Sequence, residues 1–388
     1  MATNNFKLKN LKKEKNKTLK KKIISLLNQK FLVKKYPLLL SLKKNYKYSY
    51  SFSKIKKLKK MKNFRIIGMG GSILGAQAIY SFLKYKIKKN FTFINNLNPR
   101  LNLDLKNKYV NIIISKSGNT LETISNTSLL IKNNTNILIT EKNENYLNRL
   151  SQKIKYEIFE HKNFIGGRYS VLSEVGMLPA ELMGLDARKF KKFNELIKNK
   201  KFLNNLINNC IFIYKAMKRG VRNSIILNYD QNSREFLEWY QQLTAESLGK
   251  NMKGVFPSIS TMPKDNHSLL QLYLDGPKVN FFTFFTVKEI NSQRLINEFL
   301  FDEMKKLKNK SLYDILNYQK IATENIFKKK RLPFRSFEIT SRNEDTLGEL
   351  FTFFILETII LAELMNVNAL NQPSVELVKK ETSKLLDF

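Results

Sequence analysis

The fold is decided by residues 111–120, Asn111-Ile112-Ile113-Ile114-Ser115-Lys116-Ser117-Gly118-Asn119-Thr120. The first four form a short apolar run rich in β-branched residues, which predicts a buried strand. Small and hydroxylated residues follow, and a helical pattern begins after Thr120. A strand that leads through a tight turn into a helix is the building unit of a parallel sheet with crossover helices. Residues 111–120 therefore predict an α/β fold.

The same unit recurs on both sides of this stretch. Apolar runs predict further strands at 64–67, 91–94, 136–139, 224–227, 279–282 and 334–339, with helical patterns between them. The alternation restarts near residue 200, and 388 residues exceed what one compact core usually holds. We therefore expect two doubly wound α/β domains, residues 61–200 and 201–365, each with a mainly parallel sheet flanked by helices.

The two ends of the chain are expected to be helical. Residues 1–60 are rich in Lys and carry apolar residues at helical spacing, which predicts a basic, amphipathic segment at the periphery. Residues 366–388 predict a C-terminal helix. The most apolar run, 347–365, contains three Glu residues, each costly in a bilayer, so it predicts a buried helix of a soluble protein.

The formal net charge of +37 raises the question of a polyanionic partner, because such a surface attracts nucleic acids and anionic membranes. Lys outnumbers Arg by roughly five to one, however, whereas phosphate and base recognition favour the planar Arg side chain. The chain is also rich in Asn, Ile, Phe and Tyr, as an AT-rich genome would impose. We therefore expect neither a nucleic acid nor a membrane partner, although retention on heparin that falls steeply with salt would favour one.

Cysteine usage and the N-terminus both predict a cytoplasmic protein. Cys210 is the only cysteine, so one chain forms neither a disulfide nor a thiolate metal site. The N-terminal residues lack the apolar core of a signal peptide. We expect a reducing compartment and no bound metal.

A glycine-rich turn, Gly68-Met69-Gly70-Gly71-Ser72-Ile73-Leu74-Gly75, follows an expected strand and opens a helix, where a backbone can approach a phosphate closely. A dinucleotide-binding turn would need Gly in place of Ile73, and an acidic residue where the next strand ends in Asn95-Asn96. We therefore expect no nicotinamide cofactor. On its own the turn is as compatible with a structural role as with a functional one.

A second candidate phosphate site is the hydroxyl-rich turn Ser115-Lys116-Ser117-Gly118-Asn119-Thr120, between a strand and a helix. Hydroxyls and free backbone N–H groups converge there, and the helix N-terminus adds partial positive charge. The alternative is a plain helix cap with Thr120 as the capping residue.

Four single residues are candidates for a catalytic or binding role because of the segments in which they lie. Arg168 follows two glycines in Gly166-Gly167-Arg168-Tyr169-Ser170, so nothing bulky blocks its guanidinium, although a surface ion pair is the plainer interpretation. Glu246, in Trp239–Lys250, has Gln242 one turn earlier on the same helical face, and a solvated pair with Lys250 is its alternative. His267 is one of two histidines, the side chain that titrates near neutral pH.

The fourth residue, Lys379, ends the segment Asn371-Gln372-Pro373-Ser374-Val375-Glu376-Leu377-Val378-Lys379. Without that frame it would be taken for a solvated helix lysine, and Glu376 is expected to pack or to form an ion pair. The other histidine, His161, lies outside these segments and is expected to be structural or exposed.

Six ordered segments from Gly68 to Lys379 together resemble the glucose-6-phosphate isomerase family, and the 115–120 turn is similar to the phosphosugar loop of the sugar isomerase (SIS) domain. The resemblance implies two SIS-type domains with the active site between them, an aldose–ketose isomerase that needs no cofactor, and a homodimer in which the partner subunit supplies His267. The chain is shorter than most family members, and its N-terminal part is reduced and rich in Lys.

The resemblance also implies residue roles. His267, helped by Lys379, would open the sugar ring, Glu246 would carry a proton between C2 and C1 through a cis-enediol, and Arg168 would stabilise the enediolate. The implied substrate-binding residues are Gly71, Ser72, Ser115, Lys116, Ser117, Thr120, Arg168, Gln242 and Gln372.

Two alternatives remain open from the sequence. A dual phosphoglucose/phosphomannose isomerase would differ only in the room at C2. A non-catalytic, SIS-type phosphosugar-binding protein would have no reason to keep Glu246, His267 and Lys379 together, and usually carries a DNA-binding helix pair that this chain lacks.

Overall fold

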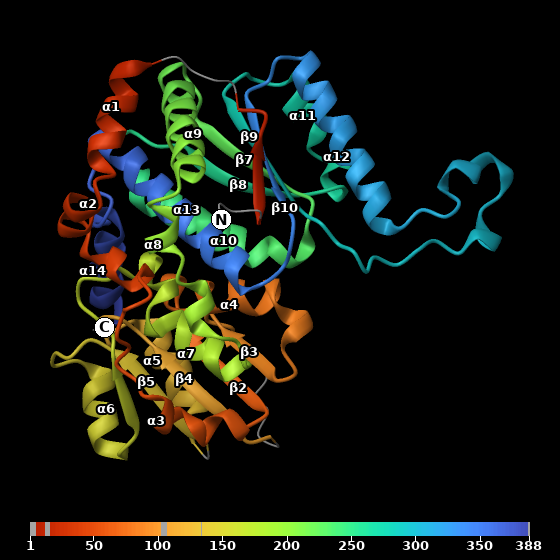
Figure 1. The fold of residues 1–388 in the computed structure, drawn as a ribbon. Coiled ribbons are helices and arrows are strands. Elements are labelled where there is room, and N and C mark those ends of the chain that lie inside the picture. The colour runs from red at the N-terminus through yellow and green to blue at the C-terminus, as the bar shows by residue number, and fades with distance from the viewer. Residues whose placement is uncertain (1–4, 12–15, 102–106, 133, 387–388) are drawn as a thin grey trace.

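Two five-stranded sheets, one in each half of the molecule, organise the chain (Figure 1). The structure is a computed structural model that describes residues 5–11, 16–101, 107–132 and 134–386. In the first sheet all strands are parallel, in the order β3-β2-β4-β5-β6. They are β2 (Asn63–Gly68), β3 (Asn90–Ile94), β4 (Val110–Ile114), β5 (Thr135–Thr140) and β6 (Glu157–Glu160). The expected parallel α/β arrangement is confirmed for this half.

The strand order of the first sheet reverses between β2 and β4, and such a switch point is where open α/β sheets bind ligands. Gly68, at the end of β2, pairs in register with Ile114, at the end of β4. The turn after β2 forms η3 (Gly70–Ser72), and the turn after β4 is the hydroxyl-rich stretch 115–120. Both candidate phosphate turns therefore lie at the same edge of one sheet.

The helices of the first half connect these strands and cover the sheet (Figure 1). They are α3 (Phe52–Lys56), α4 (Leu74–Phe82), α5 (Leu121–Leu130), α6 (Tyr146–Ile154) and α7 (Glu174–Met183), with the short turns η2 (Leu58–Lys60), η4 (Lys84–Lys86), η5 (Gly167–Leu172) and η6 (Ala187–Phe190). The helical patterns expected between the strands of this half correspond to α4, α5 and α6.

The second sheet has the order β1-β10-β9-β7-β8, and only β1 runs antiparallel to its neighbour. Its strands are β1 (Phe6–Lys9), β7 (Asn223–Asn228), β8 (Phe256–Thr261), β9 (Asn280–Val287) and β10 (Phe334–Ile339). The structure thus adds β1, β6 and β8 to the strands expected from sequence. All three are edge strands, which have one neighbour each and carry Lys, Glu or Pro within them.

A long buried helix, α13 (Glu344–Met365), forms the core of the second half, as the apolar run 347–365 predicts. Around it lie α8 (Phe193–Leu196), α9 (Lys200–Lys218) and α10 (Arg234–Leu248), and α10 also packs on α4 of the first half. The other helices are α11 (Leu270–Asp275), α12 (Leu312–Lys329) and α14 (Pro373–Leu386), with η7 (Gln231–Ser233), η8 (Lys264–His267), η9 (Asn297–Phe299) and η10 (Asp302–Leu307). Within the described ranges, no helix has the length and apolar character that crossing a membrane requires.

The N-terminal segment is less peripheral than its composition suggests. After β1 it forms α1 (Lys17–Leu26), α2 (Gln29–Lys35) and η1 (Pro37–Leu42). Ile23, Leu38 and Leu42 are fully buried, and β1 extends the second sheet. The expectation of a peripheral segment is therefore wrong for these parts, because many of their apolar residues pack into the core. The domain boundaries at residues 60, 200 and 365 stay a prediction.

A buried carboxylate beside the N-terminus gives a testable pH dependence. Asn5 donates to Glu349 Oε1 at 2.8 Å, while Glu349 Oε2 is buried and has no partner. Burial raises the pKa of Glu349 from 4.5 to about 7, against the Asn5 hydrogen bond. Its contribution to stability is therefore complete below pH 4.5 and is lost as the pH rises through 7.

Glu349→Gln is accordingly expected to raise the free energy of unfolding by about 2 kcal/mol at pH 8 and to change it little at pH 5. Urea denaturation at the two pH values measures the difference. If the substitution changed the free energy of unfolding equally at pH 5 and pH 8, burial would not destabilise the ionised Glu349 carboxylate.

Candidate active site

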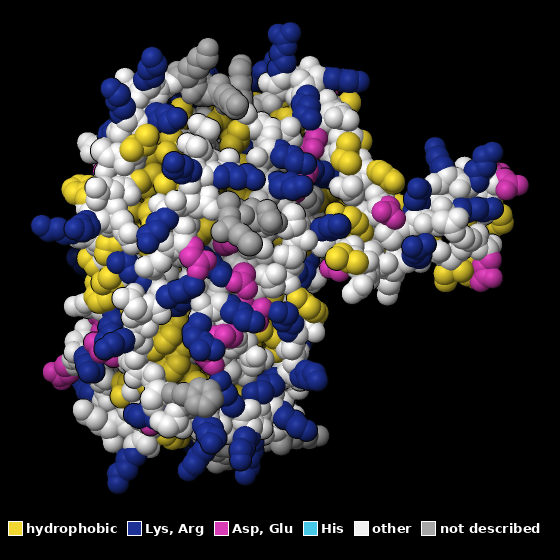
Figure 2. Space-filling model, viewed as in Figure 1, with side chains coloured by type: hydrophobic (Ala, Val, Ile, Leu, Met, Phe, Trp, Pro, Cys, Tyr) yellow, Lys and Arg dark blue, Asp and Glu magenta, His cyan; other side chains and the backbone are white. Residues whose placement is uncertain are grey.

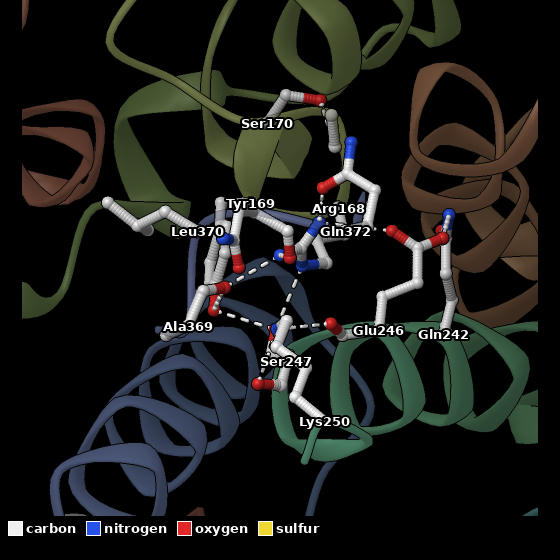
Figure 3. Close-up of polar contacts among 12 residues, drawn as sticks. Arg168, Tyr169, Ser170, Gln242, Glu246, Ser247, Lys250, Ala369, Leu370 and Gln372 are labelled. Carbon is white, nitrogen blue, oxygen red and sulfur yellow. Dashed lines mark hydrogen bonds and ion pairs between the residues drawn. The ribbon is translucent and has the colours of Figure 1, made fainter. Parts of the chain in front are cut away.

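Arg168 lies at the centre of a polar cluster between the two halves of the molecule (Figure 3). It belongs to η5, and only 3% of its side chain is exposed. Nη1 donates to Glu246 Oε2 at 3.0 Å and to Gln372 Oε1 at 2.8 Å. The surface ion pair considered from the sequence is therefore wrong: the guanidinium is buried and joins three segments far apart in the chain.

Two neighbouring glycines, Gly70 and Gly71, allow this arrangement. A Cβ atom on Gly71 would lie 2.2 Å from the carbonyl carbon of Gly167, so η3 and η5 approach at backbone distance only because Gly71 lacks a side chain. Gly70 has a φ of +51°, and a Cβ there would lie 2.7 Å from Gln242 Nε2. The glycine-rich turn at 68–75 thus serves close backbone approach, and it lets η5 place Arg168 beside α10.

Glu246 extends from α10, where both of its carboxylate oxygens accept hydrogen bonds. Oε2 accepts from Arg168, and Oε1 accepts from Gln242 Nε2 at 2.7 Å. Lys250 donates instead to the backbone carbonyls of Glu246 and Ser247, at 2.6 and 2.8 Å. The solvated Glu246–Lys250 pair is therefore wrong, and the carboxylate, 30% exposed, is oriented by Arg168 and Gln242.

A cavity of about 760 Å³ opens beside this carboxylate. It lies between residues 245–253 and residues 368–375, and both Glu246 and Gln372 line it. Lys250 lines it as well, and burial, aided by the Arg168 charge, lowers the pKa of Lys250 to about 8. A ligand can therefore reach the Glu246 side of the cluster from solvent.

The hydroxyl-rich turn lies at the carboxyl end of β4, next to η3. Ser115 is buried and its Oγ lies 2.8 Å from Thr120 Oγ1, while Ser117 Oγ accepts from the N–H of Asn119 at 3.3 Å. Thr120 is the N-cap of α5, yet its side chain makes no capping hydrogen bond. Thr120 therefore occupies the predicted N-cap position without a side-chain capping bond, and the positive end of α5 faces a turn of hydroxyl groups.

The two candidate phosphate turns lie side by side. A Cβ atom on Gly68 would lie 3.0 Å from the carbonyl oxygen of Ile114 and 3.1 Å from Ser72 Cβ. Ser72 therefore lies against the end of β4, where Ser115 begins. Lys116 points along this edge, where Nζ donates to the carbonyl oxygen of Asn163 at 2.8 Å and lies 3.4 Å from Glu141.

Two predicted catalytic residues lie apart from the cluster. His267 is exposed at the end of η8, and Lys379 is 63% exposed on α14, where it pairs with Glu376 at 2.8 Å. Among the described residues, no hydrogen bond or ion pair connects either of them to Arg168 or Glu246. His161, by contrast, is 1% exposed, and burial lowers its pKa to about 4, which fits a structural residue.

Sequence reasoning missed the partners that fix Arg168. Its Nε donates to Ser247 Oγ at 2.8 Å, and its Nη2 donates to the carbonyl oxygens of Ala369 at 2.6 Å and Asn371 at 3.2 Å. Ser247 follows Glu246 directly, so its position in the sequence could have indicated a partner for Arg168. Backbone carbonyls are present at every residue, so the sequence does not reveal which of them bind Arg168. Over the ranges that the structure describes, no group of three His, Cys, Asp or Glu side chains is arranged to hold a metal ion.

The family model described as phosphoglucose isomerase matches residues 49–387. A glucose-6-phosphate isomerase of Methanocaldococcus jannaschii is 36% identical over 357 residues, which cover 87% of this chain and 88% of that protein. The corresponding enzyme of Mycoplasmopsis synoviae is 32% identical over 354 residues, 83% of this chain and 81% of that protein.

Solved structures show the same fold at lower identity. A hypothetical protein of Thermus thermophilus superimposes with a TM-score of 0.80 at 21% identity, covering 95% of this chain and 94% of that one. A glucose-6-phosphate isomerase of Chlamydia trachomatis gives 0.73 at 16% identity, covering 100% and 89%. The predicted SIS-type α/β fold is thereby confirmed, and the match to residues 49–387 shows that the chain belongs to the phosphoglucose isomerase family.

Proposed function

We propose that this chain interconverts glucose 6-phosphate and fructose 6-phosphate by proton transfer through a cis-enediol intermediate. Family membership and the names of the relatives support the substrate and the reaction. The observation that carries the proposal is the Arg168–Glu246 pair at 3.0 Å, a buried cation beside a carboxylate that lines a cavity. That combination supplies a base for the C–H proton and a fixed charge for the oxygen that becomes negative.

In the proposed reaction Glu246 removes the proton from one carbon of the open-chain sugar and returns it to the neighbouring carbon. Gln242 holds one carboxylate oxygen and Arg168 the other, so the base keeps one orientation during both transfers. Negative charge develops on the enediolate oxygen, and the guanidinium stabilises it without moving, because its other donors are already bound. No step needs a metal or an organic cofactor.

We assign phosphate binding to the edge where β2 and β4 end. The hydroxyls of Ser115, Ser117 and Thr120 and the turn at Gly71 and Ser72 would bind the phosphate at the N-terminus of α5, and Lys116 would add a positive charge. The proximity of Ile114 and Ser72, which both lie next to Gly68, supports a single site made from both turns. Gln372, which already holds Arg168, would contact the sugar between this edge and Glu246.

We further propose that the enzyme works as a homodimer in which His267 of the partner subunit completes each site. Exposure of His267 on its own chain supports this assignment. Tyr273 of α11 and Phe327 of α12 both pack on Phe282, so the two helices cover one face of the second sheet, the face that carries His267.

A projecting arm, residues 288–311, supports the same interface. It connects β9 to α12 and extends away from the body of the molecule (Figures 1 and 2). None of its residues is buried, and it exposes a run of large apolar side chains. They are Ile290, Ile296, Phe299, Phe301 and Met304. Exposed apolar groups on this scale mark a protein–protein contact, and a second copy is the partner that would bring His267 with it.

Turnover tests the proposal directly. Purified protein with a chelator present is expected to convert fructose 6-phosphate to glucose 6-phosphate in a coupled assay, and mannose 6-phosphate in a parallel assay tests the dual specificity. The single buried Cys210 supports placing this reaction in the reducing cytoplasm. Folded protein that binds fructose 6-phosphate without converting it would instead support the non-catalytic phosphosugar-binding alternative.

A further inference from the structure

A closed ring of hydrogen bonds fixes the Nε and Nη2 side of the Arg168 guanidinium (Figure 3). Arg168 Nε lies 2.8 Å from Ser247 Oγ, which lies 2.8 Å from the Tyr169 hydroxyl. The Tyr169 hydroxyl lies 3.1 Å from the carbonyl oxygen of Ala369, and Arg168 Nη2 lies 2.6 Å from the same oxygen. The ring therefore joins η5, α10 and the segment after α13.

Only one arrangement of hydrogens satisfies this ring. A carbonyl oxygen can only accept, so the single Tyr169 hydrogen is donated to Ala369. Ser247 must then donate to the Tyr169 oxygen, and its own oxygen accepts from Arg168 Nε. Burial raises the pKa of the Tyr169 hydroxyl, against the effect of the Arg168 charge, so the tyrosine keeps the hydrogen that it donates.

The ring is isolated from water. Tyr169 and Ser247 have no exposed surface, and Ala369 is 1% exposed. A hydroxyl removed from such a place is not replaced by solvent, so its former partners stay unpaired. Loss of the Ser247 hydroxyl would therefore leave Arg168 Nε without an acceptor, and loss of the Tyr169 hydroxyl would leave the Ser247 hydroxyl without the partner that orients it. The contact of Arg168 to Glu246 would remain in both cases.

We propose that Ser247 and Tyr169 are positioning residues of the isomerisation, whose hydroxyls hold the Arg168 guanidinium in the plane that faces the reacting sugar oxygens. The inference rests on the proposed function. Neither side chain contacts the substrate in this scheme, and each acts through Arg168. Because charge on the substrate oxygen develops only in the transition state, a loosened guanidinium reduces kcat more than it reduces substrate binding.

Three variants test this role. Ser247→Ala and Tyr169→Phe each remove one hydroxyl and are expected to lower kcat roughly 10- to 100-fold while KM changes less than about threefold. Ser247→Thr keeps the hydroxyl and is expected to recover most of the kcat that alanine loses. The Ser247→Ala/Tyr169→Phe double variant should be little slower than the slower single variant, because the two hydroxyls act as one unit.

A matched control separates positioning from stability. Tyr240 lies on the same helix as Ser247, and its buried hydroxyl accepts from Arg335 at 3.1 Å and donates to Glu357 at 2.6 Å, in a network remote from Glu246. Tyr240→Phe thus removes an equivalent hydroxyl from another buried arginine. We expect it to lower the thermal midpoint as much as Tyr169→Phe does, with kcat unchanged.

A second readout is the affinity for a phosphorylated sugar hydroxamate, which imitates the enediolate. It should fall in proportion to kcat in Ser247→Ala, whereas affinity for inorganic phosphate should not change. If the wild type turns over substrate and Ser247→Ala has the same kcat, the inference is wrong and the proposed function stands. The same follows if Tyr240→Phe and Tyr169→Phe lose equal amounts of kcat. Absence of turnover in the wild type would overturn the proposed function and the inference together.

Discussion

Glu246→Gln is expected to lower kcat by about 10⁴-fold, because an amide cannot take a proton from carbon. The substitution changes little else. The amide oxygen can still accept from Arg168 or Gln242, and the side chain keeps its length in the cavity wall. Substrate affinity should therefore stay within a few-fold of the wild-type value, since the proposed phosphate site lies at the ends of β2 and β4. Steady-state kinetics and calorimetric binding of fructose 6-phosphate measure the two quantities.

Glu238→Gln is the matched control for this prediction. Glu238 lies two turns earlier on α10, where it is 33% exposed and pairs with Arg234 at 3.0 Å. The two variants remove the same charge from the same helix at nearly equal exposure. A Glu246→Gln protein that kept even a tenth of wild-type kcat, beside an unaltered Glu238→Gln, would show that another group transfers the proton.

The central strands and the edge strand β3 could be predicted from the sequence, whereas the other three edge strands, β1, β6 and β8, could not. β4, β5 and β7 are paired on both sides and are buried along almost their whole length, so they contain recognisable apolar runs. β8 begins Phe256-Pro257-Ser258, and β6 reads Glu157-Ile158-Phe159-Glu160. Such segments become strands because a neighbouring strand offers hydrogen bonds, and that is a property of the fold rather than of the segment.

The candidate site divides in a similar way. Arg168 and Glu246 were found because they stand in recognisable segments, and the structure brings them to 3.0 Å. That Arg168 is buried could not be foreseen, because its burial depends on backbone carbonyls of residues 369 and 371, about two hundred positions away. The roles of His267 and Lys379 stay predictions, since no hydrogen bond or ion pair of the described residues connects either of them to Arg168 or Glu246.

The second large effect is expected when His267 is replaced, and it tests whether two subunits share each active site. His267→Gln should lower turnover of glucose 6-phosphate by roughly 10²- to 10⁴-fold, as the loss of an acid–base group does. If the partner subunit supplies this side chain, a mixture of inactive Glu246→Gln and inactive His267→Gln protein should regain activity when the subunits exchange. In each mixed dimer, one site then contains Glu246 from one chain and His267 from the other.

The size of the recovery distinguishes the two geometries. Random exchange makes half of the dimers mixed, and each mixed dimer has one intact site of two, so about one quarter of the wild-type activity should return. If His267 acted within its own chain, every site would carry one substitution and the mixture would stay inactive. Glu246→Gln protein exchanged with itself is the blank. A variant lacking the apolar arm side chains Phe299 and Phe301 should fail to form mixed dimers. These side chains are 71% and 79% exposed in one chain, and the proposed dimer would cover them.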